Sequence, residues 1–194
     1  VSGAFGLPFG TLMTLLTGAE SCTVNCAFVV AALLEGKATL RQLSKSLSCA
    51  FVGNFVGAVL LAGLAHMAGL LGASSSAVAV EKVGVDFGSA FCRGILCNWL
   101  VCMAAYMAAF SNDLIGKAIV VWLPVSAFVA LGLDHAVANM FLIPAGMLAG
   151  APVTLYDFLI RSLLPVTLGN VVGGSGFMIF PYCVAVGSVG QHIE

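Results

Sequence analysis

The chain has 194 residues, of which 61% are hydrophobic and only 8% are charged, and its formal net charge is −1. Soluble domains carry about a quarter of charged residues, so this composition excludes a soluble globular protein and predicts an all-α, multi-pass integral membrane protein. The near-neutral charge also argues against a nucleic-acid partner. We expect the protein in the plasma or inner membrane, with the lipid bilayer as its surroundings.

The cysteines give no sign of a metal or cofactor site. Most of them lie inside apolar stretches, without the tight paired spacing that is typical of a zinc site. We therefore expect small buried side chains at these positions, and neither a metal nor a cofactor. The cysteines are Cys22, Cys26, Cys49, Cys92, Cys97, Cys102 and Cys183.

Residues 1–35 form a first hydrophobic segment that is too long for one ordinary helix. At 1.5 Å per residue, a helix of this length would overshoot a bilayer core of about 30 Å. The segment is interrupted around residues 18–25, where Glu20 and Asn25 stand among apolar neighbours. We expect a broken span here, with Glu20 as the N-cap of its second half and as an anchor of the loop.

A second over-long segment covers residues 118–148. Its only charged residue is Asp134, and His135 follows directly. Polar backbone at membrane depth is tolerated only where it is buried in protein or lines a cavity, so this break is expected to be functional. Asp134 is the second expected N-cap and loop anchor. In the alternative interpretation, Glu20 and Asp134 only hold the two breaks together.

The two broken segments belong to an internal duplication. Both breaks read Gly-x-acid-x-x-x-x-Asn, and each is followed by a Gly-Asn-x-Val-Gly stretch. The acid precedes the asparagine of that stretch by 34 residues in the first copy and by 36 in the second. Asn54 and Asn170, the two asparagines of these stretches, either pack helices together or line a pathway. The same two interpretations apply to Asn98.

Span counting predicts an inverted repeat. The second copy is displaced by three spans, an odd number, so it enters the membrane from the opposite side. Five of the six spans that such a repeat requires are present, and we expect the sixth before Val1. The further spans are 46–67, 88–110 and 160–188, and a Gly/Ser/Ala-rich connection covers 69–86. The expected units are one transmembrane domain over 1–194, a first copy over 1–67 and a second copy over 88–188.

Basic residues predict the orientation in the membrane. Three of them lie in the loop 36–45, and Lys117 falls on the same side by span counting, whereas Lys82 and Arg161 lie on the other side. Because short cytoplasmic loops carry an excess of lysine and arginine, the loop 36–45 is predicted to be cytoplasmic.

The broken helices predict the charge of the ligand. A helix that starts at mid-membrane has free amides and a dipole equivalent to about half a positive charge, and two inverted copies bring two such ends together. This favours a small anion. His135 would face this junction and donate a hydrogen bond or a proton there while remaining mostly neutral. The alternative is a core histidine whose nitrogens are both satisfied.

Several stretches together point to one family. They are Gly18-Ala19-Glu20 with Thr23, Gly53-Asn54, Arg93-Gly94-Ile95 with Asn98 to Cys102, Asp134 to Phe141 with Pro144, and Pro165 to Gly174. They resemble the formate/nitrite transporter family, and the resemblance covers nearly the whole chain. It implies an aquaporin-like protomer of six spans, a homopentamer, and in each protomer a pore for small monovalent anions such as formate, nitrite, lactate or hydrosulfide. Transport would be passive or coupled to protons.

The resemblance also implies roles for individual residues. His135 matches the family's central histidine beside the pathway, Thr23 the threonine that faces it, and Lys82 a lysine of the outer vestibule that draws in anions. Where a well-known form of the motif has Leu-Phe before the threonine, this chain has the smaller and more polar pair Ser21-Cys22. The other matches are Asn98 and Asn170, which line the pore, and Phe128 and Leu7, which fall at hydrophobic constrictions.

Two other function classes share some of these features. A water or small-neutral-solute channel would share the architecture, but it would carry Asn-Pro-Ala at both half-helix starts, where this chain has Asn25-Cys26 and Asn139-Met140. An intramembrane serine hydrolase would need Ser175 within hydrogen-bond reach of a base such as His135. The glycines around Ser175 are already explained by the duplicated packing motif, so no enzyme activity is expected.

Overall fold

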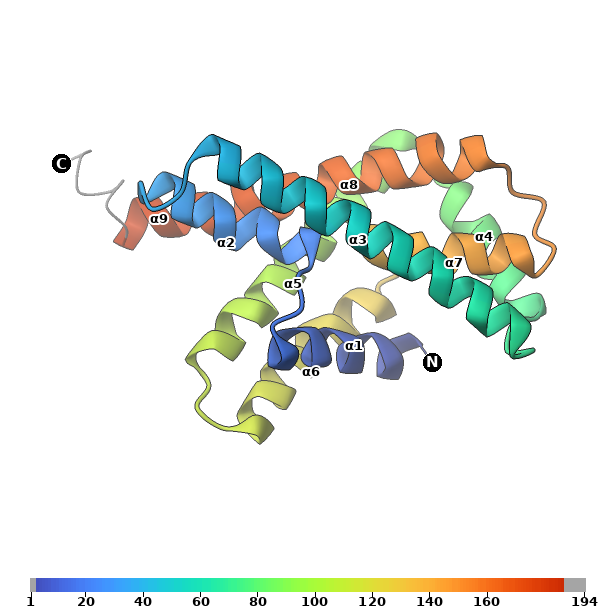
Figure 1. Ribbon diagram of the computed structural model, residues 1–194, viewed down its shortest axis with the longest axis horizontal. Coiled ribbons are helices and arrows are strands. Elements are labelled where there is room, and N and C mark those ends of the chain that lie inside the picture. The colour runs from blue at the N-terminus through green and yellow to red at the C-terminus, as the bar shows by residue number, and fades with distance from the viewer. Residues whose placement is uncertain (1–2, 187–194) are drawn as a thin grey trace.

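The computed structural model describes residues 3–186, and throughout this range the regular structure is helical (Figure 1). This confirms the all-α class. Residues 187 and 188, the last two of the predicted final span, lie outside the described range. The helices are α1 (Gly3–Thr17), α2 (Cys22–Leu34), α3 (Leu40–Met67), α4 (Ala73–Val83), α5 (Phe87–Phe110), α6 (Leu114–Ala130), α7 (Ala136–Leu148), η1 (Asp157–Leu163), α8 (Leu164–Val171), η2 (Val172–Ile179) and α9 (Phe180–Val186).

Several of these helices are suited to a membrane. Within the described range, three stretches are long and apolar enough to cross it, namely Leu40–Met67, Phe87–Phe110 and Asp157–Val184. The pair α1 and α2 makes a fourth candidate, bent by 44° at its break, while α6 and α7 are shorter apolar helices. The last span is one rod in which π-helical stretches, η1 and η2, flank α8.

Both predicted breaks are present. The first lies between Thr17 and Cys22 and the second between Ala130 and Ala136. Each contains a glycine in the left-handed region, Gly18 with φ 72° and Gly132 with φ 68°. Glycine adopts this backbone without strain because it has no Cβ, which explains why the chain turns at these two positions.

The connection 69–86 contains the helix α4, which the sequence analysis did not identify. This helix packs on α7, and a Cβ added at Gly146 would come within 2.6 Å of the Ser75 carbonyl oxygen. The serine-rich sequence of α4 hides its helical character, since serine competes with helix formation. The consequence for the site is that α4 carries Lys82 to the second break.

The helix α5 lies against the last span at very short range. A Cβ added at Gly169 would overlap the carbonyl oxygen of Phe91, and one at Gly173 would overlap that of Ile95. Glycine is therefore required on this face, and the close approach places Asn98 of α5 directly beside Asn170.

The ends of the helices agree with the predicted sidedness. The loops that follow α2 and α5 lie toward the left of Figure 1, whereas α4 lies toward the right. The predicted loop 36–45 is shorter in the structure, because α3 already begins at Leu40 behind a capping box of Thr39 and Gln42. This loop and the start of α6 share one end of the long axis, opposite the connection 69–86. Which end is cytoplasmic stays a prediction.

Candidate functional site

The two helix breaks meet at His135 and Thr23. The Nε2 atom of His135 lies 3.0 Å from the hydroxyl oxygen of Thr23, which is only 2% exposed. The ring of Phe128 stacks on the imidazole, with centroids 6.0 Å apart and an interplanar angle of 27°. Leu7 packs against the same apolar cluster as Phe128. The structure therefore brings together four residues that were predicted to belong to one pathway.

The imidazole of His135 has a defined tautomer. His135 is the N-cap of α7, and its Nδ1 atom accepts the backbone N–H of Ala138 at 3.2 Å. A backbone N–H can only donate a hydrogen bond, so Nδ1 acts as the acceptor and carries no proton. The neutral ring must therefore carry its proton on Nε2. Nε2 is then a hydrogen-bond donor toward Thr23.

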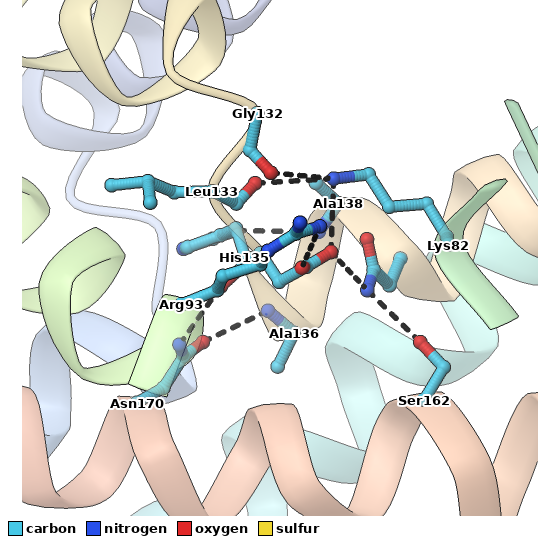
Figure 2. A network of polar contacts seen from close by, with 11 residues as sticks. Lys82, Arg93, Gly132, Leu133, His135, Ala136, Ala138, Ser162 and Asn170 are labelled. Atoms are coloured by element: carbon cyan, nitrogen blue, oxygen red, sulfur yellow. Dashed lines mark hydrogen bonds and ion pairs between the residues drawn. The ribbon is translucent and has the colours of Figure 1, made fainter. Parts of the chain in front are cut away.

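Asp134, beside this histidine, is a buried carboxylate with basic partners. Its Oδ1 atom lies 2.9 Å from the ammonium group of Lys82, and its Oδ2 atom lies 4.0 Å from the guanidinium of Arg93. Lys82 also donates to the carbonyls of Leu133 at 3.2 Å and Gly132 at 3.4 Å (Figure 2). A charge that is 1% exposed needs such pairing, so this cluster fixes the second break.

Lys82 is therefore paired with Asp134 and not with Asp86, which follows it by four residues in the sequence. Asp86 instead caps α5, because its carboxylate accepts the backbone N–H of Ser89 at 3.1 Å. The hydrogen bonds from Ser89 lower the pKa of Asp86, which lies outside the spans. The side chain of Lys82 is only 11% exposed and reaches across to Asp134.

The expected N-caps are wrong by one residue. The N-caps of α2 and α7 are Ser21 and His135, each directly after the predicted acid. The acids turn instead toward an asparagine of the following helix: Asn25 donates to Glu20, and Asn139 donates to Asp134 at 3.3 Å. Their predicted role as loop anchors agrees with these contacts.

Each of these asparagines also bonds a serine that sequence reasoning missed. Asn25 donates to Ser46 at 2.9 Å, and Asn139 donates to Ser162 at 3.1 Å. The separations of 21 and 23 residues are similar in the two copies. That matched spacing is the signal that would have identified the serines.

The asparagines of the duplicated Gly-Asn stretches hold the breaks from the side. Asn54 accepts the amide of Cys22 at 3.0 Å, and Asn170 accepts that of Ala136 at 2.8 Å. Asn98 donates to the carbonyls of Thr23 at 2.9 Å and of Asn170 at 2.7 Å. These amides are engaged in packing contacts, and their predicted role as pore-lining groups stays a prediction.

A cavity of about 340 Å³ opens beside Thr23, between α2, α3 and α8. It is bordered by Cys22 and Cys26 of α2, by Phe51 of α3 and by Thr167 of α8. Cys22 thus lies at this cavity. It belongs to the pair Ser21-Cys22, which is smaller than the corresponding pair in a well-known form of the motif.

The serine hydrolase alternative does not fit the geometry. The hydroxyl of Ser175 donates to the carbonyl of Val171, one turn earlier in the same span. The ring nitrogens of His135 are engaged by Ala138 and Thr23. Ser175 and His135 therefore do not form the nucleophile and base pair that acyl transfer requires.

Comparison with known proteins identifies the family of this chain. A family model described as formate/nitrite transporter matches residues 1–184. The chain belongs to the formate/nitrite transporter family. It is 38% identical to a probable formate transporter of Methanothermobacter thermautotrophicus, over 90% of this chain and 71% of that protein. It is also 38% identical to the formate channel BtFdhC of Bacillus thuringiensis, over 94% of this chain and 71% of that protein.

Solved structures of this transporter family have the same fold. A structure described as an FNT family ion channel matches with a TM-score of 0.84 and 32% identity, over 88% of this chain and 71% of that one. A pentameric formate channel with formate bound matches with a TM-score of 0.77 and 27% identity, over 96% and 80%. The predicted family, the integral membrane location and the absence of enzyme activity are thereby confirmed.

Proposed function

We propose that this formate/nitrite transporter carries small monovalent anions, formate foremost, along a path past His135 and Thr23 in each protomer of a homopentamer. The observation that carries the proposal is the 3.0 Å contact between these two side chains, because it joins the two helix breaks at a polar point inside apolar surroundings. Relatives described as formate channels, one of them pentameric, support the substrate and the assembly.

The basic cluster supports attraction of an anion. Lys82 and Arg93 face the single carboxylate of Asp134, so two positive charges and one negative charge leave a net charge of +1 beside the path. The guanidinium of Arg93 is the accessible charge, since its side chain is 41% exposed. Attraction at this cluster raises the local concentration of anions before they meet the apolar constriction.

The apolar constriction formed by Phe128 and Leu7 favours passage as a neutral acid. A bare charge at the bilayer centre costs at least about 2.5–3.5 kcal/mol, and protonation of the anion removes most of this cost. His135 is not the source of that proton in our proposal. Its Nδ1 atom accepts a hydrogen bond from the backbone N–H of Ala138, so the ring cannot take up a second proton at Nδ1 while this bond is present. The proton comes from the bulk aqueous solution on the side of entry, and Nε2 donates a hydrogen bond to Thr23, which orients the hydroxyl of Thr23.

The two breaks support an inverted three-span repeat as the frame of this path. Each break has an acid, an asparagine of the following helix, a serine and a Gly-Asn asparagine in corresponding hydrogen bonds. Matched bonds at both breaks are expected when two copies of one unit enclose a shared site.

A flux assay tests the proposed function. The whole protein in liposomes is offered formate, nitrite, lactate and hydrosulfide, with water and glycerol as neutral solutes. We expect anion uptake together with proton uptake, and the Ser175→Ala variant, which loses only a hydroxyl that bonds within its own span, should match the unmodified protein. Rapid passage of water or glycerol without any anion flux would contradict the proposal.

A further inference from the structure

The contact between His135 and Thr23 continues to a third side chain. The hydroxyl oxygen of Ser21 lies 2.8 Å from that of Thr23. The resulting chain of polar groups is His135, Thr23 and Ser21, and it crosses from the second helix break to the first. Thr23 is 2% exposed, whereas Ser21 is half-buried, so Ser21 is the accessible end of the chain on the α2 side.

The direction of these hydrogen bonds follows from the histidine. Because Nδ1 accepts the Ala138 amide, Nε2 donates to Thr23. Within the described residues, the partners of the Thr23 hydroxyl are His135 and Ser21. Thr23 accepts from the imidazole, and because its side chain is buried its own proton needs an acceptor, for which Ser21 is the partner present among the described residues. The proton of Ser21 is left to point away from the chain.

Ser21 also departs from the usual behaviour of a serine at its position. A serine at a helix N-cap normally accepts an amide of the first turn of its own helix. Ser21 is the N-cap of α2 but makes no side-chain cap bond. Its hydroxyl is engaged by Thr23 instead, which keeps it aligned with the histidine.

We propose that Ser21 is a specificity-determining residue, whose hydroxyl donates a hydrogen bond to the permeating anion and favours oxygen acceptors over sulfur acceptors. This inference rests on the proposed transport function. Carboxylate and nitrite oxygens are strong acceptors, whereas sulfur is a weak one. The chain from Nε2 through Thr23 orients and polarises the Ser21 hydroxyl, so the preference depends on the intact chain.

The test compares Ser21→Thr with Ser21→Val, two side chains of nearly the same shape that differ in the hydroxyl. Both are reconstituted as the whole protein in liposomes, after size-exclusion chromatography has shown the same assembly. A hydrogen bond to a charged partner is worth enough to change a rate about tenfold. We expect Ser21→Thr to keep the formate flux and Ser21→Val to lose about tenfold, with hydrosulfide flux changed by less than about twofold in both.

The outcomes separate this inference from the proposed function. Equal loss of formate and hydrosulfide in Ser21→Val, or unchanged formate flux, would overturn the role of Ser21 while transport itself stood. The absence of anion flux in the unmodified protein would instead overturn the proposed function. Ser21→Ala serves as a second hydroxyl-free variant, and it should show the same selective loss as Ser21→Val.

Discussion

Asn170 holds the second helix break as Asn54 holds the first. The side chain of Asn54 accepts the amide of Cys22 and donates to the carbonyl of Glu20, both at 3.0 Å. Asn170 likewise accepts the amide of Ala136 at 2.8 Å and donates to the carbonyl of Asp134 at 3.1 Å. Each asparagine thus replaces hydrogen bonds that the interrupted helix cannot make for itself.

The burial of the two asparagines differs, and this predicts unequal effects of their removal. Asn170 is 1% exposed and also donates to the carbonyl of Gly94 at 2.8 Å, whereas Asn54 has the more exposed site. Asn170→Ala should lower the free energy of unfolding by about 2–4 kcal/mol, because it leaves several buried groups unpaired. Asn54→Ala should cost no more than about 1.5 kcal/mol. Thermal unfolding in detergent measures both, and equal effects would contradict this ranking.

The ion pair of Lys82 and Asp134 predicts that the effects of substituting these two residues on stability are not additive. Lys82→Met leaves a buried carboxylate without its closest partner and should destabilise the protein by about 3–5 kcal/mol. The double variant Lys82→Met with Asp134→Asn should recover most of this loss, which a double-mutant cycle measures. Additive effects of the two substitutions would show that the 2.9 Å contact has no energetic role.

The same cluster predicts different salt dependences for its two cations. Arg93→Gln removes the accessible charge and should reduce formate flux mainly at low ionic strength, since salt screens exposed charges over about 8–10 Å. Lys82→Met should reduce flux at every salt concentration, because Lys82 is largely buried. If the loss in Lys82→Met were confined to low salt, Lys82 would act as the vestibule charge that the family resemblance implies.

Sequence reasoning found the features that are local. Both breaks were predicted because polar residues interrupt two apolar runs that are each too long for one helix, and the structure adds a left-handed glycine at each break, Gly18 and Gly132. The features that sequence reasoning missed depend on contacts between distant segments. Lys82 donates to the carbonyls of Gly132 and Leu133, which lie 50 and 51 residues away in the sequence, and no local pattern indicates these contacts.

The N-caps show a second limit of sequence reasoning. Acids are good N-caps, so Glu20 and Asp134 were reasonable expectations. In the structure, asparagines and a lysine from elsewhere engage their carboxylates, and the next residue becomes the cap. The chain of hydroxyls from Thr23 to Ser21 follows from this shift, so it too was invisible in the sequence.

Close packing of α5 on the last span predicts the effect of an added methyl group. Gly173→Ala would place a Cβ against the backbone of Ile95, which cannot move aside easily, and should cost about 1–3 kcal/mol of stability. Gly176→Ala is the matched control, since its added Cβ meets only Val172 at an ordinary 3.8 Å. Thermal unfolding of both variants checks this, and equal melting temperatures would contradict the tight interface.

The inverted topology predicts opposite labelling of two exposed positions. Lys37→Cys and Ser74→Cys are each made in a background without Cys49 and Cys92, which are exposed and not buried as the sequence predicted. Both variants are treated with a membrane-impermeant thiol reagent in sealed cells. Ser74→Cys should react from outside, and Lys37→Cys only after permeabilisation, because the loop 36–45 is predicted to be cytoplasmic. Labelling of both from one side would contradict the inverted repeat.

The contact between His135 and Thr23 is the centre of the proposed transport path, and formate flux through a His135→Phe variant tests its role most directly. Phenylalanine keeps an aromatic ring beside Phe128 but has no nitrogen to donate to Thr23 or to accept the Ala138 amide. For the unmodified protein in liposomes, we expect formate uptake that rises as external pH falls and is accompanied by proton uptake. For a folded and inserted His135→Phe protein, we expect both uptakes to be abolished or sharply reduced. Formate and proton uptake at the rates of the unmodified protein would contradict the proposed role of His135.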